Sequence, residues 1–464
     1  MTIRIRTTRR ARTRVRRKLI AGLVATSMAA LLSACGAGTG SGPNEINWWT
    51  WDDKQAAGYE ACATAFEKAN PGVHVKISQY QSTDYFTKLL ANFVAGTAPD
   101  AFQNSPQFFQ QYASLNQLMP LDDLMARTGY DLDKFSTGTN TWKYTDGKQY
   151  GLPLDWASAA FFYSGDTMKK AGYTAADLDS MTWNPDDGGS FDKVVAHLTV
   201  DKKGVRGDEP GFDKKHVATF GIGTMGTKDF TGQMTWAPFL LSMGWHMGDK
   251  ALWPTKFNYD DPRFARTMKY IRSLSDRGFA PRDGEFASAG NTPSGPELIG
   301  SGKVALMPDG SWAAANYALV PKLKIKIAPT VLGPDGKTRG EVSSSNGNNI
   351  WAGTPHPDLT WKWVSYMGSE DCQTRASAGG SFFPSIPAAM DASAKSMLRK
   401  GVDLSVFIDQ QKNGELNPSP PYGNGTELQA VVEPLIQEYF SHGRNEDVFA
   451  QMAKKTKSLL AEGK

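Results

Sequence analysis

The chain has 464 residues, 40% of them hydrophobic, and a formal net charge of +4. This length exceeds what one hydrophobic core normally serves, so we expect two domains of a soluble globular protein. Nine of the basic residues lie between Met1 and Lys18, and without residues 1–34 the net charge becomes −5. The basic whole-chain charge therefore gives no support for a nucleic-acid partner, and none is expected.

The N-terminal segment predicts export. Its basic start carries no acidic residue, and an uncharged run of sixteen residues follows and ends at Leu32-Ser33-Ala34, before Cys35. A membrane-spanning helix needs about 20 strongly apolar residues, so 1–34 is interpreted as a signal peptide that is removed. Residues 35–43 are rich in glycine and are expected to form a flexible tether.

The tetrapeptide that ends at Cys35 resembles the bacterial lipoprotein signal-peptidase box. This resemblance implies cleavage before Cys35 and attachment of lipid to its sulfur. The alternative is an ordinary secretory signal that contains a cysteine. Arg16-Arg17 also resembles a twin-arginine export signal, so the export route stays open.

The mature sequence alternates strand-like and helix-like segments. Alternating or β-branched runs predict strands, and apolar residues at helical spacing predict helices; in chain order these are strand 45–51, helix 56–69, strand 73–77, helix 85–95, strand 160–163, helix 191–198, helix 262–278, strand 303–307, helix 360–369 and helix 427–439. This order is typical of an α/β protein with parallel strands.

Two cysteines remain in the mature part, Cys62 and Cys372. Outside the cytoplasm an even pair is a disulfide candidate. The alternative is two separate buried thiols, which is a common state of free cysteine.

Several short motifs together resemble one family. They occur in order over almost the whole mature chain, at 66–75 (FEKANPGVHV), 95–100 (AGTAPD), 118–123 (LMPLDD), 146–153 (DGKQYGLP), 162–172, 300–312 (GSGKVALMPDGSW) and 382–384 (FFP). The chain is similar to the bacterial extracellular solute-binding proteins that include the maltose- and multiple-sugar-binding proteins of ABC importers.

The resemblance implies a two-lobed periplasmic-binding-protein fold of the type II-like kind. Each lobe would be a mixed sheet flanked by helices, and three hinge crossovers would join them near 152–157, 329–341 and 380–387. Lobe 1 would comprise 44–154 and about 330–380, and lobe 2 about 155–329 and about 381–464. On this map Cys62 and Cys372 share a lobe, which favours the disulfide.

The ligand site is expected in loops after strands, because open α/β sheets bind ligands at the carboxyl ends of their strands. Those loops combine tryptophan faces, which cover the C–H patches of a sugar, with side chains that bond its hydroxyls. The candidate ligand-binding residues are Trp51, Asp52, Gln79, Asp100, Asn104, Asp155, Trp156, Trp236, Gly310, Ser311, Trp312, Asn346, Asn348 and Phe382.

Structural roles compete with these assignments. Asp52 could cap the first helix, and Asp100 could turn the chain after Pro99. Six other tryptophans are assigned mainly to packing, namely Trp48, Trp142, Trp183, Trp253, Trp361 and Trp363.

Two other classes of function remain as alternatives. A secreted glycosidase-like enzyme would need paired carboxylates, for which Asp52 and Asp155 are the candidates, although nothing in the sequence pairs them. The run Gly221–Gly226 matches a dinucleotide-binding pattern without a helix start, so it is interpreted as coincidence. A ligand sensor on the same fold is the other alternative.

The sequence thus predicts a substrate-binding subunit of an ABC importer that captures a sugar or oligosaccharide by hinge closure. It would be a monomer without cofactor, metal ligands or catalytic residues. Its partners would be a carbohydrate and the transmembrane permease subunits. The lipid on Cys35 would hold it on the extracytoplasmic face of the cell membrane, which suits a Gram-positive organism.

Overall fold

The computed structural model describes residues 42–227, 229–287, 292–320, 323–441, 443 and 445–462. The expected signal peptide, the lipid attachment at Cys35 and most of the tether lie outside the described residues. Two five-stranded sheets organise the described part, and a third sheet has two short strands, one of which lies in a segment that connects the two larger sheets.

The first sheet has the strand order β2-β1-β3-β11-β4. Its strands are β1 (Glu45–Thr50), β2 (His74–Gln79), β3 (Ala101–Asn104), β4 (Gly151–Pro153) and β11 (Gly347–Ile350). β1 pairs in parallel with β2 and β3, whereas β11 runs antiparallel to β3 and β4. The sheet is therefore mixed, as the predicted fold class requires.

Helices cover both faces of this sheet. They are α1 (Ala56–Ala69), α2 (Ser82–Ala95), α3 (Pro106–Ser114), α4 (Asp122–Thr128), η1 (Thr139–Trp142), α12 (Pro357–Met367) and α13 (Glu370–Ser377). Ile46 and Trp48 of β1 enter the core beneath α1 and α12, while Trp49 enters a second cluster beneath α2 and α3. Successive side chains of a strand point to opposite faces, so β1 supplies both cores.

A disulfide joins α1 to α13. The sulfurs of Cys62 and Cys372 are bonded across 310 residues of sequence, with Cα atoms 5.1 Å apart. Gly58 lets the two helices come this close, because a Cβ atom there would lie 2.5 Å from the carbonyl oxygen of Ala376. The disulfide favoured by the sequence is therefore present.

The second sheet has the order β6-β7-β8-β5-β9. Its strands are β5 (Ala159–Ser164), β6 (Val200–Asp201), β7 (Val217–Ile222), β8 (Val304–Gly310) and β9 (Ile325–Ala328). β5 alternates between two cores: Phe161 belongs to the larger cluster, and Phe162 to the smaller one.

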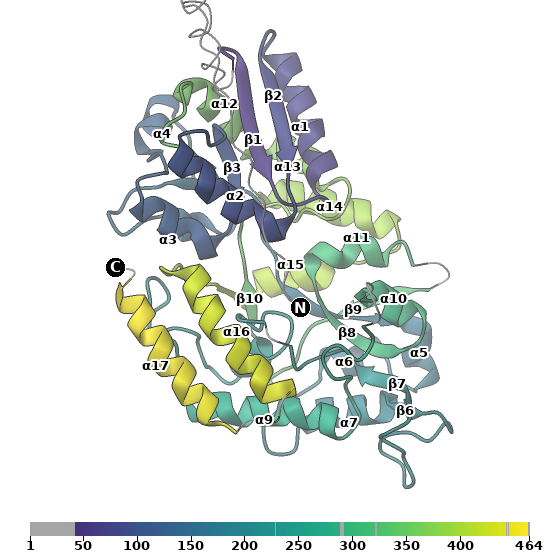
Figure 1. Ribbon diagram of the computed structural model, residues 1–464. Helices are drawn as coiled ribbons and strands as arrows, with labels where there is room; N and C mark the ends of the chain where they lie inside the picture. Colours follow the sequence, from purple (N-terminus) through teal and green to yellow (C-terminus); the bar gives the residue numbers. More distant parts are fainter. Residues whose placement is uncertain are drawn as a thin grey trace, which may run out of the picture. The chain divides into compact units, whose positions relative to one another are not determined.

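Many helices pack around the second sheet. They are α5 (Gly165–Lys170), α6 (Ala175–Asp179), α7 (Gly189–Leu198), α8 (Ala237–Leu241), α9 (Pro262–Asp276), α10 (Gly295–Gly300), η2 (Ser311–Ala313), α11 (Ala314–Tyr317), α14 (Pro387–Arg399), α15 (Ser405–Lys412), α16 (Gly425–Ser441) and α17 (Asp447–Glu462). The C-terminal pair, α16 and α17, lie side by side (yellow in Figure 1).

Three segments connect the elements of the two sheets, at 154–158, 329–346 and 378–386. They are joined to one another by isolated bridges between Asp155 and Pro384 and between Ala157 and Ser344. The second segment contains β10 (Glu341–Ser343), which pairs in parallel with β12 (Leu416–Pro418). The three connecting segments therefore meet at one place, and the candidate site lies there.

Some elements differ from the sequence-based expectation. β1 ends at Thr50, because Asp52 begins a turn in which its carboxylate accepts hydrogen bonds from the backbone N–H groups of Lys54 and Gln55. The helix expected at 85–95 begins at Ser82. α14 and α17 were not predicted.

Candidate functional site

A polar cavity of about 270 Å³ lies where the three connecting segments meet. It is bordered by the β1–α1 loop, the three connecting segments, the start of η2 and one residue of the loop before α8. The lining residues are Trp51, Asp52, Gln55, Asp155, Trp156, Ala157, Gln233, Ser311, Trp312, Ser344, Asn346, Ser381 and Phe383. We call this space the polar cavity.

Trp312 is the tryptophan that presents its ring most openly to the polar cavity. It follows directly after β8 and is 36% exposed. The ring lies against Gly310, where a Cβ atom would be 2.2 Å from the Cη2 atom of the indole. Glycine at position 310 is therefore required for the indole to take this place, and its exposed surface is available to cover an apolar patch of a ligand.

The other two aromatic walls are held by the protein. Trp156 is 1% exposed, donates its Nε1–H to the carbonyl oxygen of Pro384 at 2.9 Å and meets the ring of Phe383 edge-on. Trp51 packs against Tyr85 and Phe86, with ring centroids 5.2 and 5.1 Å away. Trp156 and Trp51 therefore shape the cavity, and other protein groups cover much of their ring surface.

Asp155 is buried and fully engaged. Its Oδ1 accepts a hydrogen bond from the backbone N–H of Asn346 at 3.0 Å, and its Oδ2 accepts from the amide groups of Asn346 and Gln55, both at 3.2 Å. Burial raises the pKa of Asp155, and these donors act in the opposite direction. The carboxylate thus joins the first and second connecting segments to the start of α1.

Asp52 has a different environment. Its Oδ1 accepts from the backbone N–H groups of Lys54 and Gln55 in the turn before α1. The N-cap residue of α1 is Gln55 and no side chain caps this helix by a hydrogen bond, so the capping role considered for Asp52 is not observed. Its other carboxylate oxygen has no hydrogen-bond partner among the described residues. Burial, with a further contribution from Asp155, raises the pKa of Asp52 to about 6. Asp52 can therefore accept a hydrogen bond from a ligand as a carboxylate above that pH.

Two further polar residues, Ser311 and Gln233, line the polar cavity. The hydroxyl of Ser311 is buried and, within the described part of the chain, has no hydrogen-bond partner. Leaving such a group unsatisfied costs about 1–3 kcal/mol, which a ligand hydroxyl would offset. Gln233 donates its Nε2–H to the carbonyl oxygen of Val342 at 3.0 Å, so its side-chain oxygen is held at the cavity.

The structure brings seven of the fourteen predicted ligand-binding residues together around the polar cavity. These are Trp51, Asp52, Asp155, Trp156, Ser311, Trp312 and Asn346. Gly310 and Gln79 act beside it: Gly310 makes room for Trp312, and Gln79 donates its amide to the carbonyl oxygens of Trp51 and Tyr80.

The other five residues are buried outside the lining. Asp100 accepts from the Asn47 backbone and the Thr354 hydroxyl, and Asn348 accepts from the Trp48 indole. Buried packing or a local backbone bond holds the rest, which are Asn104, Trp236 and Phe382. In all five the side chain serves the framework.

Six lining residues were not predicted, namely Gln55, Ala157, Gln233, Ser344, Ser381 and Phe383. Ser344 could have been inferred, because residues two apart in an extended segment share a face and Asn346 was already a candidate. Gln233 lies in a loop far from any recognised motif, and no signal in the sequence indicates it.

Metal and membrane features can be assessed for the described ranges alone. There, no group of three or more His, Cys, Asp or Glu side chains is placed to hold a metal ion. Within the same ranges, no helix combines the length and apolar character needed to cross a membrane. The Gly221–Gly226 run begins in β7 rather than leading into a helix.

Known proteins share this architecture. A crystal structure of UspC from Mycobacterium tuberculosis superimposes with a TM-score of 0.70 and 24% identity, covering 89% of this chain and 100% of that one. An ABC substrate-binding protein, Lmo0181 from Listeria monocytogenes in complex with cycloalternan, gives a TM-score of 0.73 at 17% identity, covering 90% and 99%. These likenesses show a common fold.

Sequence comparison agrees with the structural likeness. The maltodextrin-binding protein MdxE of Bacillus subtilis is 23% identical over 384 residues, which is 81% of each chain. Residues 61–398 match the family described as bacterial extracellular solute-binding protein. The matched range spans well over half of the chain, so this protein belongs to the family of bacterial extracellular solute-binding proteins.

Proposed function

We propose that the chain captures a sugar or oligosaccharide in the polar cavity. The indole of Trp312 covers a C–H face of one sugar ring, and Asp52, Ser311 and Asn346 bond its hydroxyls. The observation that carries this proposal is the exposed Trp312 ring beside the unpartnered Ser311 hydroxyl and the partly free Asp52 carboxylate. Relatives named as binding proteins for maltodextrin, arabinooligosaccharide and lactose support the choice of ligand class.

The protein then works as the binding subunit of an ABC importer. Lobe 1 (44–154 and about 330–380) and lobe 2 (about 155–329 and about 381–464) close around the ligand at the three connecting segments. The closed monomer delivers the sugar to the transmembrane permease, and lipid on Cys35 keeps it on the extracytoplasmic face of the cell membrane. A flexible tether over 35–43 gives it the reach to dock.

Capture without chemistry is favoured over hydrolysis by the environment of Asp155. A glycosidase needs two carboxylates that act on the scissile bond. Both oxygens of Asp155 accept hydrogen bonds from Asn346 and Gln55, so it serves to join chain segments. Asp52 alone is left to meet a ligand.

The proposal is tested by mass spectrometry of small molecules released from freshly purified protein, followed by titration calorimetry with the sugars identified. A common panel of mono- and oligosaccharides serves if the protein is purified empty. We expect 1:1 binding of at least one sugar, with recovery of that sugar unchanged after long incubation. Silence across the panel, or cleavage of the sugar, would contradict the proposal.

A further inference from the structure

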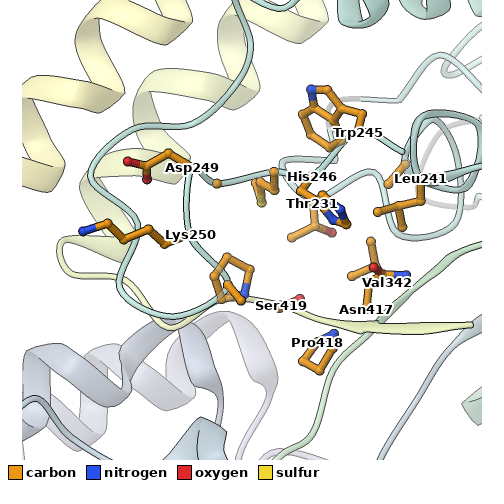
Figure 2. A pocket seen from close by; sticks show the side chains of 15 residues that line it. Thr231, Leu241, Trp245, His246, Asp249, Lys250, Val342, Asn417, Pro418 and Ser419 are labelled. Atoms are coloured by element: carbon orange, nitrogen blue, oxygen red, sulfur yellow. The ribbon is translucent and has the colours of Figure 1, made fainter. Parts of the chain in front are cut away.

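A second cavity of about 280 Å³ has walls of mainly apolar side chains. They come from α8, the loop after it, β10, β12 and the segment that follows β12, and include Ala237, Leu241, Trp245, Met247, Val342 and Pro418. Figure 2 shows Leu241, Trp245 and Val342 on one side of this space, while the charged ends of Asp249 and Lys250 point away from them. We call this space the apolar cavity.

The apolar cavity lies next to the polar cavity along one face of the second connecting segment. Val342, Ser344 and Asn346 are partly exposed, and the residues between them are buried. This period of two places the three side chains on the same face of an extended chain. Val342 lines the apolar cavity, and the other two line the polar cavity. At about 3.3 Å per residue, Val342 and Ser344 are roughly 7 Å apart.

The loop before α8 passes between the same two spaces. Thr231 lines the apolar cavity and Gln233 the polar one. The amide of Gln233 donates to the carbonyl oxygen of Val342 at 3.0 Å, so this side chain marks the boundary between the cavities. Each cavity alone is slightly smaller than the 300–1,000 Å³ usual for ligand pockets, and the two combined fall within that range.

Three of the polar side chains that line the apolar cavity are already engaged with the protein. Asp249 accepts from the backbone and hydroxyl of Thr255, Asn417 donates to the carbonyl oxygen of Glu415, and the Thr231 hydroxyl donates to Asp229. A second sugar ring would find these groups occupied, whereas an apolar group needs none of them. The two neighbouring cavities therefore differ in the chemistry that they accept.

We propose that this protein selects a glycoside that carries an apolar substituent, with the sugar in the polar cavity and the substituent in the apolar cavity. This rests on the proposed function and names the ligand class more closely. The substituent is an alkyl or aryl group, because Leu241, Val342 and Met247 offer contact surface of that kind. Burial of such a group stabilises the complex in proportion to the apolar area removed from water.

The test compares methyl and hexyl glycosides of the same sugars by titration calorimetry, over a panel of α- and β-linked common pyranosides. For the sugar that binds, the hexyl glycoside should bind at least about tenfold more tightly to the unaltered protein. Val342→Phe, which fills the apolar cavity and keeps the backbone oxygen bonded by Gln233, should abolish this difference and leave the methyl glycoside affinity unchanged.

Met247→Gln provides a second variant if Val342→Phe fails to fold, and it should reduce the preference for hexyl in the same way. Equal affinities for methyl and hexyl glycosides in the unaltered protein would overturn the inference while the proposed function stands. A hexyl preference that survives in both variants would also overturn it. If neither kind of glycoside binds, the inference is overturned, and the panel of mono- and oligosaccharides decides whether the proposed function stands.

Discussion

Two dipeptides that line the polar cavity, Asp155-Trp156 and Ser311-Trp312, have opposite roles. Trp156 is 1% exposed and bonded to Pro384, and both oxygens of Asp155 accept hydrogen bonds. Trp312 is 36% exposed, and the Ser311 hydroxyl has no partner among the described residues. Both pairs combine an indole with a polar side chain, but one holds the protein together and the other is proposed to contact the ligand.

The difference follows from position in the chain. Asp155-Trp156 lies in a connecting segment that is bridged to the other two, and a buried segment outside regular sheets must find partners for its polar groups. Ser311-Trp312 follows the end of β8, where a sheet leaves side chains free to face a cleft. Residue type alone therefore does not identify a ligand contact.

The largest expected effect is a loss of stability when Trp156, in the first connecting segment, is replaced. Trp156→Ala removes a fully buried indole and should lower the free energy of unfolding by about 3–5 kcal/mol. Trp312→Ala should change it by less than about 1 kcal/mol, because the ring is partly solvated. Urea denaturation of both variants measures the contrast, and equal losses would show that our division of roles is mistaken.

The next effect is on binding. Trp312→Ala should weaken sugar affinity by about 2 kcal/mol, roughly 30-fold, because it removes the aromatic face that covers the ligand. Trp351→Ala is the matched control, since Trp351 is also partly buried but does not line the polar cavity. Calorimetry with the identified sugar should find the affinity of the Trp351→Ala variant unchanged. A comparable loss of affinity in both variants would argue against the Trp312 contact.

The smallest effect concerns pH. Burial raises the pKa of Asp52 to about 6 from an ordinary value of 3.8, so the folded state binds more protons than the unfolded state between these values. The contribution of Asp52 to stability is therefore lost as pH rises from about 4 to about 6. Sugar affinity should change in the opposite sense and weaken below pH 6, since the carboxylate is the better acceptor.

The Asp52→Asn variant tests whether Asp52 is the group that makes sugar affinity depend on pH. The variant should bind the sugar more weakly than the unaltered protein does at pH 7.5. Its own affinity should be nearly the same at pH 5 as at pH 7.5. Titration calorimetry between pH 5 and pH 7.5 measures the sugar affinity of the variant and of the unaltered protein. An unchanged pH dependence in the variant would mean that another group titrates in the site.

Much of the fold could be predicted from the sequence. The helix at Ala56–Ala69 and the strand after Asn70-Pro71-Gly72 follow from apolar spacing and a strong stop signal. Asn346 was expected just after the second crossover, in the return to lobe 1, and the two-residue period of an extended segment would have added Ser344. Such features can be predicted from the sequence because they depend on residues only a few positions apart.

The site itself was predicted in part. Trp236 has the residue type of a sugar contact, yet its ring meets Trp245 and Phe264 edge-on inside a core. Asn348 follows the same return segment as Asn346, but its oxygen accepts from the Trp48 indole. Whether such a side chain meets a ligand depends on which distant segment packs over it.

The sequence by itself determined part of the order of strands and helices, the candidate cysteine pair and the supply of tryptophan, aspartate and amide side chains at strand ends. These follow from periodicity, turn residues and composition, which act over a few positions. Tertiary structure alone decided that Asp155 is saturated and Asp52 is not, and that Val342 and Gln233 divide two cavities of different polarity. Hydrogen bonds between segments up to 191 residues apart make that choice, and no local pattern encodes them.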